Sequence, residues 1–179
     1  MLSINALSDL GRYRWTVPLM ALVAERRGTR FAEMAHRLGL SRESLTRTLE
    51  AAGAAGWIVR NSGHGHPLRP EYVPTAEGLR IGEACRAIVA TQAQLGLAPD
   101  ALSRWSLPIL RLIADGHGRF NAIARALDAA NPRAMTASLR GLVELDLVDR
   151  RVLAGFPPTS AYALTARGGV LADSLPLAA

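Results

Sequence analysis

The stretch Trp15-Thr16-Val17-Pro18-Leu19 returns 90 residues later as Trp105-Ser106-Leu107-Pro108-Ile109. The next shared dipeptide, Arg30-Phe31, returns as Arg119-Phe120 at a shift of 89, so one residue is missing from the preceding turn. The shift then recovers to 90 in the pairs Leu45/Met135, Thr46/Thr136, Leu49/Leu139, Arg60/Arg150, Tyr72/Tyr162, Thr75/Thr165 and Gly78/Gly168. Because a slip confined to a turn is typical of two copies of one folded unit, we predict two domains, residues 1–95 and 96–179.

The first part of each copy predicts three helices. Thr16 or Ser106 is expected to cap the first helix, and a proline lies in its first turn, where a missing N–H costs little. A second helix is predicted by apolar residues at helical spacing from Phe31 to Leu38, and Gly39 is expected to end it. The third helix is expected to begin after Ser41 in the first copy and after Asn131 in the second.

The second part of each copy predicts a β-hairpin and a closing helix. Strands are expected at 57–60 and 71–73 in the first copy, and at 147–150 and 161–163 in the second. Loops rich in Gly and Pro, 61–70 and 152–160, separate them. The predicted fold class is therefore mainly α with small β-hairpin wings, as two tandem winged helix-turn-helix domains related by pseudo-two-fold symmetry.

Composition narrows the class of protein. Of the 179 residues 49% are hydrophobic, which is enough for a real core, and the formal net charge is +6. All 21 basic residues are arginine, a side chain suited to phosphate and base edges, although a GC-rich genome would favour the same usage. The single cysteine, Cys85, excludes an internal disulfide, and no apolar run is long enough to span a membrane, so we expect a cytoplasmic protein.

The order of these motifs resembles the HxlR family of bacterial winged-helix regulators. The resemblance rests on Trp-Thr/Ser-x-Pro-Leu/Ile, Arg-Phe before the second helix, the leucine-spaced third helix and Tyr-x-x-Thr-x-x-Gly after the loop. It implies sequence-specific binding of double-stranded DNA by the third helix, phosphate contacts from the wing, and pairing of two winged helices. Many relatives carry a reactive cysteine just before the first tryptophan, but Tyr13 and Arg14 precede Trp15 here, so thiol sensing is not carried over.

The candidate DNA-binding residues lie on the third helices and the wings. On a helix that reads the major groove, arginine can bind guanine in a bidentate manner, while Ser and Thr read bases more loosely. The alternative for each is an ordinary solvated surface. The candidates are Ser41, Arg42, Glu43, Thr46 and Arg47 on the first helix, Asn131, Arg133, Thr136 and Arg140 on the second, and His64, His66, Arg69 and Arg151 in the wings.

Other classes of function find little support in the sequence. No catalytic or cofactor motif occurs, so we expect neither an enzyme nor a cofactor, and His64-x-His66 alone does not predict a metal site. Cys85 is expected to be a small buried apolar residue. The expected protein is a monomeric transcriptional regulator whose two repeats form an internal pseudo-dimer. The alternatives left open are a sensor holding a small-molecule effector between the repeats, and an interaction scaffold.

Overall fold

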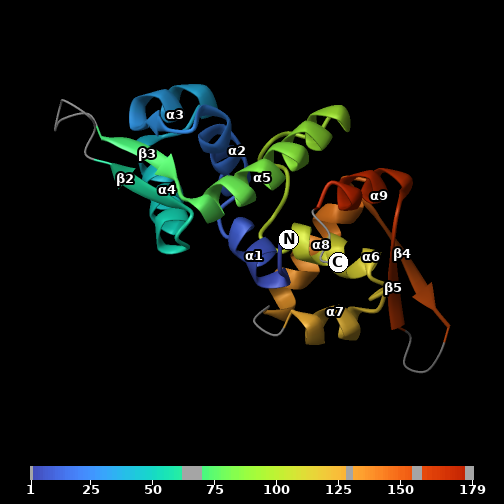
Figure 1. The fold of residues 1–179 in the computed structure, drawn as a ribbon. Helices are drawn as coiled ribbons and strands as arrows, with labels where there is room; N and C mark the ends of the chain where they lie inside the picture. The colour runs from blue at the N-terminus through green and yellow to red at the C-terminus, as the bar shows by residue number, and fades with distance from the viewer. Residues whose placement is uncertain (1, 62–69, 128–130, 155–158, 176–179) are drawn as a thin grey trace. The chain divides into compact units, whose positions relative to one another are not determined.

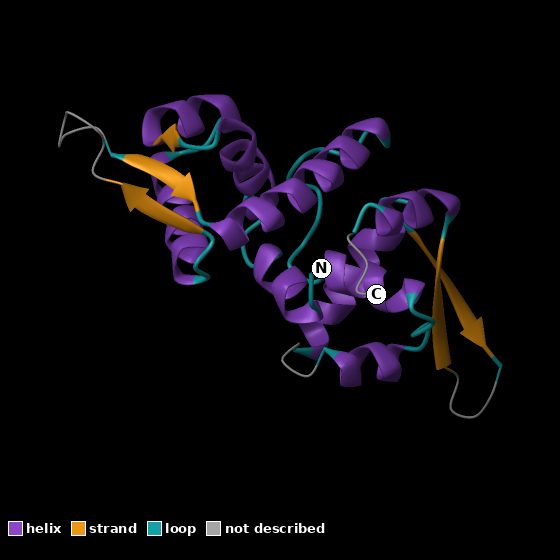
Figure 2. Cartoon of the chain, in the orientation of Figure 1, coloured by secondary structure: helices purple, strands orange, loops and turns teal. Residues whose placement is uncertain are grey.

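The computed structural model describes residues 2–61, 70–127, 131–154 and 159–175. This part of the chain is mainly helical and carries two small antiparallel sheets (Figures 1 and 2). It divides into two compact units, residues 15–90, here the N-half unit, and residues 1–14 with 91–179, here the C-half unit. The boundary between repeats expected at residues 95 and 96 stays a prediction.

The N-half unit contains a three-helix core beside a small sheet. The sheet has the order β1-β3-β2, and Arg60 faces Tyr72 across the antiparallel β2–β3 pair. The elements are α2 (Thr16–Arg26), β1 (Thr29–Arg30), α3 (Phe31–Leu38), α4 (Arg42–Ala54), β2 (Ile58–Asn61), β3 (Glu71–Pro74) and α5 (Ala76–Gln94). The last turn of α5, from Thr91 onward, belongs to the C-half unit.

The C-half unit repeats the order helix, helix, helix, hairpin, helix. Arg150 faces Tyr162 across its antiparallel hairpin, as Arg60 faces Tyr72 in the other unit. Its elements are α1 (Ile4–Leu10), α6 (Ser106–Ala114), α7 (Phe120–Ala126), α8 (Pro132–Glu144), β4 (Val148–Leu153), β5 (Thr159–Leu164) and α9 (Ala166–Asp173). The sequence patterns did not predict α1, which packs against α6.

The predicted apolar stripes form the two cores. In the N-half unit Leu19, Met34 and Leu45 are fully buried, one from each of the three helices. Ile109, Ile123 and Met135 are their fully buried counterparts in the C-half unit. Helix α3 ends as expected, because Gly39 adopts a left-handed conformation with a φ of 62°.

The beginnings of α2 and α6 differ from the prediction. Thr16 and Ser106 are not N-caps but the first residues of their helices, and both are buried. Trp15 and Trp105 occupy the cap positions without a side-chain hydrogen bond. The hydroxyl of Ser106 instead accepts a hydrogen bond from the backbone N–H of Ser103, at 3.0 Å. Both hydroxyl residues therefore lie buried in the first turn of their helices instead of capping them.

The C-half hairpin is longer than predicted. Strand β4 continues through Val152 to Leu153, and β5 begins at Thr159, all within the range expected to be loop. Val152 faces Ser160 and Leu153 faces Thr159 in the ladder. β-branched residues favour this extended backbone, so their preference outweighs the loop signal of the neighbouring Gly and Pro residues.

Candidate nucleic-acid interface

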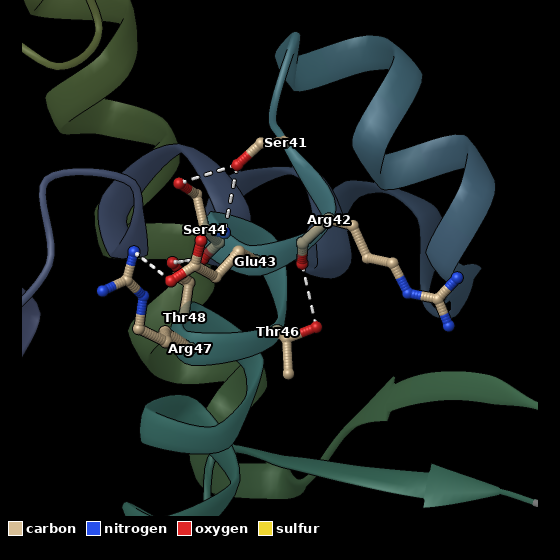
Figure 3. Close-up of polar contacts among 7 residues, drawn as sticks. All are labelled: Ser41, Arg42, Glu43, Ser44, Thr46, Arg47 and Thr48. Carbon is tan, nitrogen blue, oxygen red and sulfur yellow. Dashed lines mark hydrogen bonds and ion pairs between the residues drawn. The ribbon is translucent and has the colours of Figure 1, made fainter.

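The third helix of the N-half unit, α4, begins at a well-formed cap. The Ser41 hydroxyl accepts a hydrogen bond from the backbone N–H of Ser44 at 3.3 Å and donates to the Ser44 hydroxyl at 3.1 Å (Figure 3). Leu45, Leu49 and Ala52 are buried on the inner face. The cap and the apolar face together fix which side chains of α4 reach solvent.

The exposed face of α4 is already engaged in local contacts. Glu43 and Arg47 form an ion pair at 3.3 Å across one helical turn, and the Thr46 hydroxyl donates to the Arg42 carbonyl at 2.9 Å (Figure 3). The guanidinium of Arg42 extends away from Arg47 and lies 5.8 Å from the ring centroid of Phe31 on α3. The two arginines of this face therefore meet DNA only by leaving or sharing these contacts.

The third helix of the C-half unit, α8, presents a different exposed face. The Asn131 side chain caps the helix by accepting from the Arg133 N–H at 2.9 Å, and the Thr136 hydroxyl donates to the Pro132 carbonyl at 2.8 Å. Arg133 and Arg140 are exposed. Since residues 133, 136, 137 and 140 lie on one side of a helix, both guanidinium groups share a face with Thr136.

A concave site adjoins this face of α8. It has a volume of about 720 Å³, and its walls come from α7 with its preceding residue, from α8 and from the β4–β5 hairpin. We call it the arginine groove and define it by Arg119, Arg125, Arg140 and Arg150 together with Phe120 and Tyr162. No described carboxylate forms an ion pair with any of its four arginines. The groove is therefore a strongly cationic concavity.

Local backbone geometry fixes the walls of the arginine groove. Arg150 and Tyr162 are directly opposed in the hairpin, and Ser160 lies two residues before Tyr162, so the three side chains share one face. The Ser160 hydroxyl accepts two hydrogen bonds from the Arg150 guanidinium, at 3.0 and 3.2 Å. The backbone N–H of Tyr162 donates to the carbonyl of Gly118 at 2.6 Å, which joins the hairpin to the turn before α7.

Glycine is required at position 118 for this junction. A Cβ atom there would lie 2.8 Å from the carbonyl oxygen of Tyr162. The close approach also brings Arg119 opposite Ala161 in an isolated antiparallel bridge. A small side chain at 161 and none at 118 therefore place Arg119 and Phe120 beside the hairpin.

The predicted wing residues have mixed outcomes. His64, His66 and Arg69 lie outside the described residues. Arg151 is exposed on β4, but its side chain lies on the hairpin face opposite Arg150, because successive strand residues alternate. Of the predicted set, the structure brings Thr136 and Arg140 together in the arginine groove, while Arg133 and Asn131 lie at the start of α8.

Sequence reasoning missed Arg119, Arg125 and Arg150 as site residues. Arg119 belongs to the repeated Arg-Phe dipeptide, and Arg150 is the arginine that the second predicted strand shares with Arg60. The signal that distinguishes Arg119 is the partner of its counterpart: Arg30 pairs with Glu71 at 3.3 Å, whereas position 161, which corresponds to 71, is alanine. An alignment of the two copies by charge would have found it.

Other chemistry is sparse among the described residues. Cys85 is fully buried, and desolvation by burial raises the pKa of its thiol far above the ordinary value, so the thiol stays protonated. The described ranges hold no group of three or more His, Cys, Asp or Glu that suits a metal ion. Within those same ranges, every helix is too short or too polar to cross a bilayer.

Comparison with known proteins supports a helix-turn-helix assignment for the second half of the chain. No curated protein matches this sequence. One similar solved structure is a proposed transcriptional regulator of the MarR family from Enterococcus faecalis V583, with 28% identity over 50% of this chain and 76% of that chain and a TM-score of 0.40. Residues 102–177, which contain α8 and the whole arginine groove, match the family described as HxlR-like helix-turn-helix.

Proposed function

We propose that this protein is a sequence-specific, double-stranded DNA-binding transcriptional regulator and that the C-half unit makes the principal contact with DNA. The observation that carries the proposal is the exposed face of α8, where Arg133 and Arg140 flank Thr136, next to the other three arginines of the groove, Arg119, Arg125 and Arg150. A recognition helix lies in the major groove of DNA with its N-terminal residues at the base edges, and α8 carries exposed polar side chains at that end. The neighbouring arginines suit the phosphates on either side of the groove. The match of residues 102–177 to a helix-turn-helix family supports it independently.

The positions of Arg133 and Arg150 suggest different roles, reading of base edges for one and binding of phosphate for the other. Arg133 lies near the beginning of α8, where a recognition helix contacts base edges, and its substitution should relax sequence preference. Arg150 lies on the hairpin and is held by Ser160, a placement that suits a phosphate. Its substitution should weaken binding to all sequences alike.

The test is a binding measurement on the full chain with duplexes selected from random DNA. Affinity is measured by fluorescence anisotropy over a range of salt concentrations, with the parent, Arg133→Ala and Arg150→Ala. The parent should show a linear fall of log affinity with log salt, because each phosphate contact contributes about 0.9 to the slope. Each variant should lose about 1 to 3 kcal/mol of binding free energy, with altered base preference only for Arg133→Ala.

A matched control is Arg86→Ala, which removes one exposed arginine from α5, where it pairs with Glu83 at 3.0 Å. It changes the net charge as the test variants do but should leave DNA affinity within about twofold of the parent, since Arg86 is paired with Glu83 and belongs neither to α8 nor to the groove. Equal losses in all three variants would indicate general charge attraction and contradict a specific interface on α8.

We further propose that one chain supplies both halves of a paired winged-helix regulator. The support is the shared order of elements in residues 15–90 and 91–179 and the 90-residue sequence repeat. Because the two third helices differ in their exposed residues, one chain should protect an asymmetric site. Footprints and the protein-to-DNA stoichiometry test this: a palindrome bound by two chains would disprove it. A ligand held between the repeats stays an alternative prediction.

A further inference from the structure

The arginine groove has features that flat contact with a DNA backbone does not need. Its volume of about 720 Å³ falls within the range of roughly 300 to 1,000 Å³ found for small-molecule sites. It is a concavity inside one winged-helix unit, formed by α7, α8 and the hairpin, and every wall of it belongs to the described residues. Its dimensions therefore suit an organic molecule of moderate size.

The cations of the groove favour a ligand with more than one negative charge. Four arginines line the groove, and no described carboxylate forms an ion pair with any of them. Arginine binds phosphate through two parallel hydrogen bonds, and such charge-assisted contacts are about twice as strong as neutral ones. Arg150 is already oriented by Ser160, so less side-chain entropy is lost when it binds an anion.

The remaining wall of the groove favours a flat ring. Phe120 and Tyr162 are each only partly buried, and both line the cavity. Leu139 and Val143 on α8 add apolar surface to the lining. Stacking of a base on an aromatic side chain contributes about 1 to 3 kcal/mol, and arginine planes also stack on rings.

We propose that the arginine groove binds a free nucleotide, meaning a phosphorylated small molecule with a flat ring, and that this ligand competes with DNA for Arg140 and Arg150. The competition rests on the proposed function, whereas the binding of the nucleotide does not. The phosphates lie against the arginines and the ring lies against Phe120 and Tyr162. DNA is then released when the ligand concentration rises, because the same guanidinium groups cannot serve both partners.

The first experiment measures binding of three probes to the full chain by isothermal titration calorimetry: ADP, adenosine and inorganic pyrophosphate. ADP should bind more tightly than either fragment, because only ADP uses both the ring wall and the cations. Arg140→Ala should weaken ADP binding by roughly tenfold or more, consistent with loss of a charge-assisted hydrogen bond. Arg86→Ala, outside the groove, should leave it unchanged.

The ring wall is tested with Tyr162→Leu and, as a second variant in case the first does not fold, Phe120→Leu. Either should weaken ADP and leave pyrophosphate binding as in the parent. Pyrophosphate binding as tight as ADP, or no binding by any of the three probes, would overturn the proposal. So would equal losses of ADP affinity in Arg86→Ala and Arg140→Ala.

A second experiment separates this proposal from the proposed function. DNA binding is measured first without nucleotide, and ADP is then added to the complex. Release of DNA by ADP but not by adenosine is the expected result. If DNA binds and ADP does not, the groove proposal fails and the DNA proposal stands. If ADP binds the groove and no duplex binds, the DNA proposal fails and nucleotide binding stands without competition.

Discussion

Helices α4 and α8 are each the third helix in the shared order of elements, but the charges on their exposed faces differ. Each is 13 residues long, begins at a side-chain cap and buries a leucine stripe. On the exposed side, α4 carries Glu43 and Glu50 among its arginines, and α8 carries arginine at both corresponding positions, Arg133 and Arg140. The comparison teaches that two helices can share a buried stripe and one exposed threonine, Thr46 or Thr136, while the charges of their outer faces differ.

The contrast extends beyond the two helices. At the positions of the four groove arginines the N-half unit has Arg30, His36, Glu50 and Arg60. Arg30 is paired with Glu71, so part of the remaining positive charge is neutralised within the unit. The N-half unit thus has two arginines where the groove has four, and it has Glu50 and Glu71 where the C-half unit has Arg140 and Ala161, so we expect the C-half unit to dominate DNA binding.

The largest predicted effects are losses of stability from equivalent glycine substitutions in the two units. A Cβ atom at Gly78 would overlap the backbone carbonyl of Trp57, and one at Gly168 would overlap that of Leu147. Gly78→Ala and Gly168→Ala should each destabilise the chain by about 3 kcal/mol or more, since backbone must shift in both cases. Urea unfolding measures this. Unequal losses of unfolding free energy would indicate that Gly78 and Gly168 do not have equivalent structural roles, and the comparison of the two units would then not hold.

The next effect should distinguish the halves. The double variant Arg133→Ala/Arg140→Ala should weaken binding of a selected duplex far more than Arg42→Ala/Arg47→Ala. The expected cost is about 1 to 3 kcal/mol for each arginine that contacts DNA, whereas Arg47 is held by Glu43 and Arg42 lies over Phe31. Anisotropy titrations at one salt concentration are enough. The reverse order would assign the reading role to α4.

A smaller gain is expected when α4 is made to resemble α8. Glu50→Arg removes a carboxylate and places arginine at the position that corresponds to Arg140. DNA affinity should rise and its salt dependence should steepen, by about 0.9 in slope if one further phosphate is contacted. Glu83→Arg on α5 is the charge-matched control. Equal gains in both would mean that net charge, and not its place, controls binding.

The smallest expected effect is none, at Cys85. Burial raises the pKa of this thiol, so the thiol stays protonated throughout the physiological pH range, and it is shielded from reagents. Cys85→Ala should leave DNA affinity unchanged with reductant and with peroxide, and a thiol reagent should label the native parent slowly. An oxidant response that the variant loses would make Cys85 a sensor and give the N-half unit a regulatory role.

The sequence predicted the helices and hairpins because each depends on residues close together in the chain. The spacing of Phe31, Met34 and Leu38 or the cap at Ser41 is a local signal, and the structure agrees with it. Helix α1 was not predicted although it carries local signals, the Ser3 cap and the helical spacing of Leu7 and Leu10. Its packing against α6, nearly a hundred residues away, follows from neither signal. Local patterns therefore predict elements better than they predict their partners.

The arginines of the groove were open to prediction one by one, but their assembly into one site was not. Its cations come from three separate segments, and Arg119, Arg140 and Arg150 each look like solvated surface residues when considered alone. The placement of Arg119 beside the hairpin depends on the approach of Gly118 to Tyr162, which no periodicity encodes. The ion pair of Glu43 with Arg47, by contrast, follows from their four-residue spacing on a helix and was open to prediction.

The long hairpin of the C-half unit has a mechanical consequence. Its base is clamped to α9, because Thr165 donates through its backbone N–H to the Leu147 carbonyl at 3.1 Å and through its hydroxyl to the Asp146 carbonyl at 2.7 Å. Six residues per strand then extend for about 20 Å from this clamp. A hairpin held at its base moves least near that base. Arg150, the third residue of β4, lies near the clamp, so we expect its position to vary less than that of residues near the tip of the hairpin.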